Sequence, residues 1–136
     1  MAFVLDASIT LCWAFADEEH PLAAAALDRI QQDEAQVPSL WWFEVRNSLV
    51  VNERRGRLSE TESASFLRNL GQLAINVDRT PAEAALMTLA RQHRLTVYDA
   101  AYLELAQREG VPLATLDTAL RQAAKVVGVS LLAEAA

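Results

Sequence analysis

The stretch Thr96–Gly110, TVYDAAYLELAQREG, begins with apolar residues, continues through one aspartate and ends in an alanine-rich segment. The apolar run Leu95–Tyr98 predicts a buried strand, and Ala100–Arg108 predicts a helix. Asp99 stands at the junction of the two, with no other charged residue within four positions on either side. An aspartate at such a junction often only caps the helix, which contributes about 1 kcal/mol. It belongs to a functional site if other acids occupy the same kind of junction.

The same alternation of short apolar runs and helical segments continues along the chain. Further strands are predicted at 3–5, 73–77, 112–114 and 129–132, with a marginal one at 37–38. Further helices are predicted at 8–16, 21–32, 39–55, 59–70, 81–93 and 118–126. Ser39 is expected to cap the third of these, and Ser59 with Glu62 forms an S-x-x-E capping box.

This order of elements predicts an α/β fold of three layers. We expect a central, mostly parallel sheet of about five short strands, flanked by helices on both faces. The 136 residues contain no repeat and no linker, so one domain is expected to span 1–136.

The composition limits the classes of function. The net charge of −6 argues against a general nucleic-acid-binding surface, although arginines do cluster in ERRGR at 53–57. The lone Cys12 is expected to be a small core residue, because no partner for metal binding or catalysis stands near it. The chain begins without a basic leader and has no apolar run approaching about 18 residues. We therefore expect a cytoplasmic protein without a membrane partner.

Two further aspartates follow predicted strands, as Asp99 does. Asp6 comes directly after FVL, and Asp117 lies just past the strand at 112–114, two residues after Thr115. In a parallel sheet these three acids lie at the carboxyl edge, which is where open α/β sheets bind ligands.

A fourth acid, Glu44, stands on the predicted helix 39–55. Its neighbours Trp42, Phe43 and Val45 are apolar, so its carboxylate is expected to be partly buried and in need of a partner. Asn47 follows three residues later and shares its face of the helix.

Four carboxylates that lie close together repel one another, and a divalent cation relieves that repulsion. Mg²⁺ and Mn²⁺ prefer oxygen ligands of this kind, and a cation held by them can activate water against a phosphodiester. Zinc is not expected, because His20 and His93 are predicted to lie at the surface at helix ends. In the alternative interpretation, the three aspartates only cap helices and Glu44 is an unrelated, half-buried acid.

Four motifs now carry a family resemblance: V-L-D-A-S, F-E-V-R-N, V-Y-D-A-A-Y-L-E-L-A and L-A-T-L-D-T-A-L, in this order. With them the chain resembles a PIN domain, specifically a VapC-type toxin ribonuclease of bacterial type II toxin–antitoxin modules. The resemblance spans the chain from the first predicted strand to the last. It implies a PIN-like fold and a Mg²⁺- or Mn²⁺-dependent endoribonuclease, in which a water activated by the metal hydrolyses RNA and leaves a 5′-phosphate and a 3′-hydroxyl.

The resemblance assigns roles residue by residue. The catalytic and metal-binding acids that it implies are Asp6, Glu44, Asp99 and Asp117. Ser8 and Thr115 match hydroxyl positions near the waters of the metal, and Asn47 matches a polar residue often found beside the helix acid.

The resemblance also implies partners. These are the RNA substrate, a second copy in a homodimer, and a cognate antitoxin whose C-terminal segment lies in an apolar groove and blocks the site. The candidates for lining that groove, which are otherwise ordinary core residues, are Trp13, Trp41 and Trp42. The candidate contacts to RNA phosphates, which are otherwise a solvated helix end, are Arg54, Arg55 and Arg57.

Two other classes of function are compatible with acids at a sheet edge. A phosphoacceptor module of the receiver type gathers acids there too, but it needs a lysine at the end of a late strand. Lys125, the single lysine, falls inside the last predicted helix instead. A non-catalytic interaction protein could keep the fold and the partners, although the complete set of acids argues against it.

Overall fold

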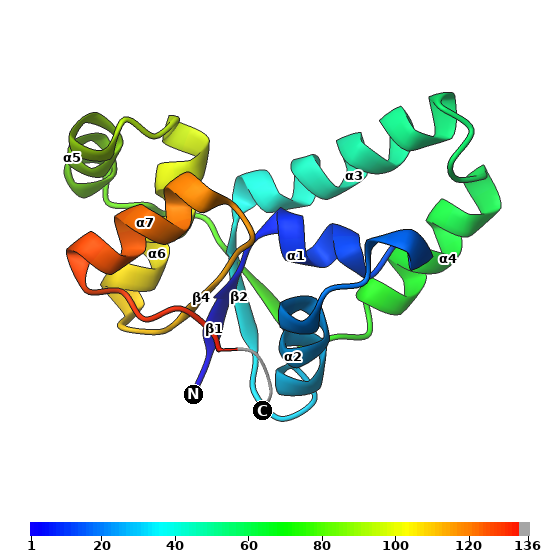
Figure 1. Cartoon of the computed structure of the whole chain (residues 1–136), viewed down its shortest axis with the longest axis horizontal. Coiled ribbons are helices and arrows are strands. Elements are labelled where there is room, and N and C mark those ends of the chain that lie inside the picture. The colour runs from blue at the N-terminus through cyan, green and yellow to red at the C-terminus, as the bar shows by residue number, and fades with distance from the viewer. Residues whose placement is uncertain (134–136) are drawn as a thin grey trace.

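Four short parallel strands form the centre of the computed structural model, which describes residues 1–133 (Figure 1). The strands are β1 (Phe3–Leu5), β2 (Ala35–Pro38), β3 (Ile75–Asp78) and β4 (Leu113–Ala114), in the spatial order β3-β2-β1-β4. All three pairings are parallel. The predicted α/β fold with a parallel sheet is confirmed.

The strand β1 is the centre of the core, because it pairs on both sides and its three residues are fully buried. Its register sets Val4 opposite Leu113, and the backbone N–H of Asp6 donates to the Ala114 carbonyl at 3.0 Å. The ends of β1 and β4 are therefore level with one another. The residues that follow these two strands enter the same edge of the sheet side by side.

Helices cover the sheet on both sides. Figure 1 shows α1 and α2 on one side and α6 and α7 on the other, with α3 and α4 extending away from the sheet. The helical segments are α1 (Ala7–Cys12), the 3₁₀ turn η1 (Ala16–Glu18), α2 (Pro21–Arg29), α3 (Ser39–Arg54), α4 (Glu60–Leu70), α5 (Glu83–His93), α6 (Val97–Glu109) and α7 (Thr118–Val127). Within the described residues 1–133, none of the helices has the length and apolarity needed to cross a membrane.

The strand predicted at Leu95–Tyr98 is wrong. Arg94 ends α5 in the left-handed conformation, and Thr96 caps α6 by accepting a hydrogen bond from the Asp99 backbone N–H at 3.0 Å. Val97 and Tyr98 form the exposed first turn of α6 rather than a buried strand. The turn and cap at this point prevail over the β propensity of the apolar run.

The prediction of a strand at 129–132 is also wrong. Leu131 makes one isolated parallel bridge to Leu113, and the Leu132 N–H donates to the Leu113 carbonyl at 2.9 Å. The segment therefore lies beside β4 at the edge of the sheet, but it is not a strand. The described sheet therefore has four strands where about five were predicted.

Several helix limits differ from the prediction; α2, for example, ends at Arg29 instead of position 32, and α5 begins at Glu83 instead of position 81. The first helix ends at Cys12 instead of position 16, and the chain enters η1 through Phe15. Ser39 is the first residue of α3 and does not cap it, because Pro38 occupies the N-cap position without a side-chain hydrogen bond. The capping box of Ser59 and Glu62 is confirmed, with both reciprocal bonds at 3.0 Å.

The most deeply buried helix is α6, whose seven consecutive residues 100–106 are all buried. One of them, Glu104, is charged and has only 2 % of its side chain exposed. Arg108 donates to its carboxylate with both Nε and Nη2, at 2.8 and 3.0 Å. The same guanidinium reaches Asp78 at the end of β3 at 2.8 Å, so that one arginine connects α6 to the sheet.

Replacing Arg108 with alanine should lower the free energy of unfolding by about 3 kcal/mol, because it leaves the buried Glu104 carboxylate without its counter-charge. Urea denaturation measures this change. The exposed Arg91 of α5 provides the control, since Arg91→Ala removes the same charge from the surface and should change stability by less than about 0.5 kcal/mol. Equal stability of the two variants would contradict this account of α6.

Candidate active site

One cavity of about 320 Å³ opens at the carboxyl edge of the sheet, and we call it the acid cavity. Its lining comes from β1–α1, α3, α6 and the start of α7, and consists of Asp6, Ala7, Ser8, Leu11, Glu44, Asn47, Asp99 and Asp117. All four acids singled out in the sequence therefore lie around one opening, together with Ser8 and Asn47. Thr115 lies behind this lining and is fully buried.

The Asp6 carboxylate does not cap a helix, although Asp6 occupies the N-cap position of α1. Its Oδ2 atom accepts hydrogen bonds from Ser8 Oγ at 2.7 Å and from Thr115 Oγ1 at 2.6 Å. The side chain is 7 % exposed. Simple capping, one of the two interpretations of this residue, is therefore excluded, and the carboxylate is fixed by two hydroxyls at the wall of the cavity.

The direction of these two hydrogen bonds is set by the backbone of the turn between β4 and α7. Ser8 Oγ accepts from the Leu116 N–H, and Thr115 Oγ1 accepts from the Asp117 N–H, both at 3.1 Å. Each hydroxyl thus receives an N–H and has its own proton free to donate to Asp6. The arrangement connects β1 to the turn that carries the next acid.

The other two aspartates both reach the cavity, but only Asp117 also caps a helix. Asp117 caps α7, with Oδ1 accepting from the Leu120 N–H at 2.8 Å. Asp99 lies in the first turn of α6, after the cap Thr96, so its predicted place directly after a strand is wrong. It reaches the acid cavity from a helix instead.

Glu44 is half-buried on α3, as expected, and its partner is Tyr102. The Tyr102 hydroxyl donates to Glu44 Oε1 at 2.5 Å, across from α6. Tyr102 was not among the residues singled out in the sequence. The available signal was its spacing, because it follows Asp99 by three residues and therefore shares that face of α6.

The acids influence one another electrostatically. Burial raises the pKa of Asp6, and the charge of Asp117 adds to this effect against the opposing hydrogen bonds from Thr115 and Ser8. Burial likewise raises the pKa of Glu44, with further contributions from Asp6 and Asp99. The pKa of Asp99 is raised by burial, then by Asp117 and Asp6. The folded chain thus holds these carboxylates where a positive charge would be favourable.

A hydrated divalent cation fits this donor set. The lining contains carboxylate, hydroxyl and amide oxygens, and no basic side chain among the described residues belongs to it. Within residues 1–133, however, no three acidic, histidine or cysteine side chains converge closely enough to form a ready-made metal cage. Mg²⁺ commonly keeps several waters and takes only one or two carboxylates directly, so an open set of acids suits it better than zinc.

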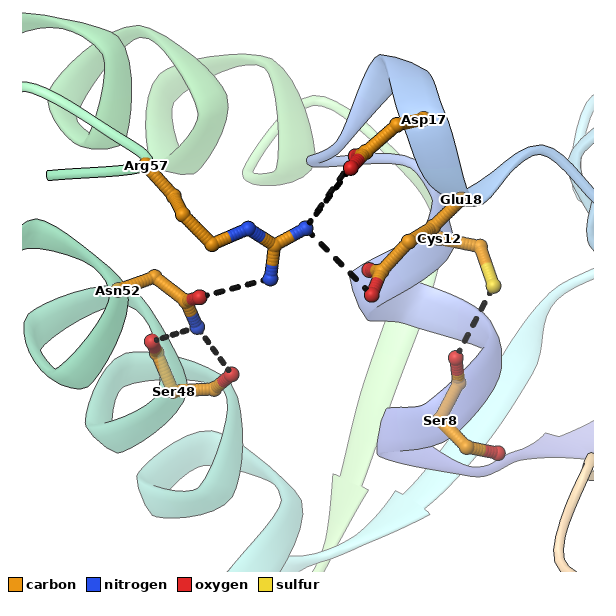
Figure 2. A network of polar contacts seen from close by, with 7 residues as sticks. All are labelled: Ser8, Cys12, Asp17, Glu18, Ser48, Asn52 and Arg57. Atoms are coloured by element: carbon orange, nitrogen blue, oxygen red, sulfur yellow. Dashed lines mark hydrogen bonds and ion pairs between the residues drawn. The ribbon is translucent and has the colours of Figure 1, made fainter. Parts of the chain in front are cut away.

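Arg57 is engaged within the protein, as Figure 2 shows. From the loop after α3 its Nη2 reaches Asp17 at 3.2 Å and Glu18 at 3.6 Å, and its Nη1 donates to Asn52 Oδ1 at 2.9 Å. Asn52 in turn donates to the Ser48 carbonyl at 2.7 Å. This network connects the end of α3 to η1. The two carboxylates neutralise the guanidinium of Arg57.

The other two arginines of the cluster, Arg54 and Arg55, are exposed at the end of α3. A second cavity of about 470 Å³ lies beneath Arg57 and shares Ser8 and Leu11 with the acid cavity. The two cavities are therefore neighbours along α1.

The three tryptophans occupy different environments. Trp41 is buried in the core and donates from Nε1 to Thr10 Oγ1 at 2.9 Å, so its assignment to a groove is wrong. Trp42 is 45 % exposed and lies under the Arg46 guanidinium at 3.9 Å. Trp13 lines an apolar cavity of about 860 Å³ beside α1 and α2, which also includes Phe15.

Comparisons with known proteins agree with the fold and the motifs. The family model for the PIN domain matches residues 3–126. Ribonuclease VapC3 from Pyrobaculum aerophilum is 36 % identical over 126 residues, which cover 90 % of this chain and 94 % of that protein. The resemblance inferred from the four motifs is confirmed.

Solved structures share the fold at lower identity. PAE2754 from Pyrobaculum aerophilum superposes with a TM-score of 0.71 at 24 % identity, over 90 % of this chain and 84 % of that one. A toxin–antitoxin complex from Klebsiella pneumoniae gives 0.65 at 18 % identity, over 97 % and 98 % of the two chains. On its sequence and its fold, the chain belongs to the PIN-domain family and, within it, to the VapC proteins.

Proposed function

We propose that this chain is a metal-dependent endoribonuclease and acts as the toxin of a toxin–antitoxin module. The observation that carries the proposal is the acid cavity, which four carboxylates line and in which the pKa values of Asp6, Glu44 and Asp99 are raised. The 36 %-identical relative is named a ribonuclease, which supports RNA as the substrate. Phosphodiester hydrolysis needs stabilisation of the negative charge that develops at phosphorus, and carboxylates cannot supply that without a cation.

The cofactor that we propose is Mg²⁺ or Mn²⁺, held by Asp6, Glu44, Asp99 and Asp117. When bound, such a cation neutralises developing charge on the phosphodiester and lowers the pKa of the attacking water. Asp6 contributes a carboxylate whose orientation is fixed, because Ser8 and Thr115 hold one of its oxygens.

Asn47 lines the same cavity and is exposed. Its side-chain amide can donate to a phosphate oxygen, which makes it a candidate for orienting the RNA. Arg54 and Arg55 remain the proposed contacts to more distant phosphates. Arg57 is a weaker candidate than the sequence indicated, because Asp17 and Glu18 already neutralise it.

The proposed protein partners are a cognate antitoxin and a second copy of the chain. The apolar cavity beside Trp13 and Phe15 suits an apolar segment of an antitoxin, and one of the solved structures that share the fold is a toxin–antitoxin complex. A cytoplasmic location is part of the same proposal, since RNA and a cytoplasmic antitoxin would both be found there.

Neither alternative function gains support from a particular contact. Lys125 is exposed on α7 and does not belong to the lining of the acid cavity, so the lysine that a phosphoacceptor site requires has no counterpart among these residues. All four acids lie around one cavity, which argues against a purely non-catalytic role.

The purified chain should cleave total RNA in Mg²⁺ or Mn²⁺, and Asp6→Asn or Asp99→Asn should reduce the rate at least about 100-fold, because each removes charge that holds the cation. The rate is measured by gel electrophoresis of the products, with EDTA abolishing cleavage. Both substitutions preserve side-chain size, so the fold should survive.

Asp28→Asn is the matched control, because Asp28 is exposed on α2 and lies outside the acid cavity. Its preparation should cleave RNA like the unsubstituted chain. Cleavage that persists unchanged in the Asp6 variant would indicate a contaminating nuclease and remove the support for this site.

The metal-free chain should become less stable as the pH rises from about 4, near the ordinary pKa values of Asp and Glu side chains, to about 8. The folded-state pKa values of Asp6, Glu44 and Asp99 are raised, so these groups stabilise the fold fully below their unfolded pKa values and lose that effect as the pH passes the raised values. We expect the Tm to fall by a few degrees, and Mg²⁺ or Mn²⁺ to restore it at the higher pH.

Thermal denaturation followed by circular dichroism measures both effects. In Asp6→Asn the fall in Tm between the two pH values should be smaller, since one of the repelling carboxylates is gone. A Tm that rises with pH in the unsubstituted chain, or the same fall in both proteins, would contradict the electrostatic account of the cavity.

A further inference from the structure

The carboxylate of Glu44 is held by one hydrogen bond, which comes from another helix. Asp6 is fixed by two hydroxyls, Asp117 is fixed by capping α7, and Asp99 lies in the first turn of α6, where its backbone N–H donates to Thr96. Glu44 has a longer side chain and lies in the interior of α3, away from any helix terminus. Among the described residues, the Tyr102 hydroxyl is the hydrogen-bond partner of its carboxylate.

Tyr102 is well suited to fix a mobile carboxylate. It has no exposed surface and belongs to the buried run of α6, so its ring has no freedom to follow Glu44. The phenol hydroxyl carries one proton, and the geometry directs that proton to Glu44 Oε1.

The next inference rests on the proposed function. It concerns Tyr102, which acts on the site through Glu44. We propose that Tyr102 is a positioning residue for the cation, because its hydroxyl fixes Oε1 of Glu44 and leaves Oε2 as the oxygen available to the acid cavity. The same side chain connects α3 to α6, so it sets the position of Glu44 relative to Asp99, one turn earlier on α6. Tyr102 itself does not touch the substrate.

The test uses Tyr102→Phe, which removes the hydroxyl and keeps the ring in the core. Isothermal titration calorimetry of the metal-free chain with Mn²⁺ should show an affinity at least about tenfold lower, as is usual when a group that orients a metal ligand is removed. Tyr98→Phe is the control, because Tyr98 is on the same helix and 66 % exposed. Its Mn²⁺ affinity should equal that of the unsubstituted chain.

A double-mutant cycle separates positioning from packing. In a Glu44→Gln background, adding Tyr102→Phe should change Mn²⁺ affinity by less than about twofold, because the group through which Tyr102 acts is already altered. Loss of the same factor in both backgrounds would mean that Tyr102 acts only through the core, and would overturn the inference. Unchanged affinity in Tyr102→Phe alone would overturn it as well.

A second measurement requires no change at Tyr102. The chain has two tyrosines, Tyr98 and Tyr102, so labelling with ¹³Cζ-tyrosine gives two resolved NMR signals. The Tyr102 signal should shift in Glu44→Gln, while the Tyr98 signal should stay in place. An unshifted Tyr102 signal would overturn the inference and leave the proposed function intact, whereas a wild-type chain that neither binds Mn²⁺ nor cleaves RNA would remove both.

Discussion

Mutual repulsion among carboxylates at the carboxyl edge of the sheet is the constraint on which the rest of the structure depends. Asp6 and Glu44 are anchored by hydrogen bonds that also connect separate elements of the fold. The hydroxyls of Ser8 and Thr115 hold Asp6 and tie β1 to the turn before α7. Because these hydrogen bonds stabilise the fold and orient the acid at once, the chain tolerates a group of like charges that would otherwise push the strand ends apart.

Much of this arrangement could be predicted from local patterns. The apolar triplet before Asp6 predicted the end of β1, and the short apolar run at 112–114 predicted β4. The parallel sheet then required Asp6 and Asp117 to lie at one edge. Glu44 was recognised because a charge among Trp42, Phe43 and Val45 needs a partner. The alternation of strands and helices was sufficient for the fold class, since parallel strands require crossovers of this kind.

Other features depended on contacts that no local pattern reveals. The segment around Val97 and Tyr98 has the composition of a strand, but the cap at Thr96 begins a helix there, and the exposure of both side chains is decided by the whole fold. Tyr102 meets Glu44 across 58 positions of sequence, and Arg57 meets Asp17 across 40. Pairings of that range depend on how α3 packs, which a single sequence does not specify.

The order in which the chain supplies the site has a consequence for its synthesis. Asp6 leaves the ribosome before the other acids of the cavity, whereas Thr115 and Asp117 come after every other part of it. Until that last segment emerges, Asp6 lacks the Thr115 hydroxyl that donates to its carboxylate. A nascent chain therefore carries an incomplete site until this last segment has been synthesised.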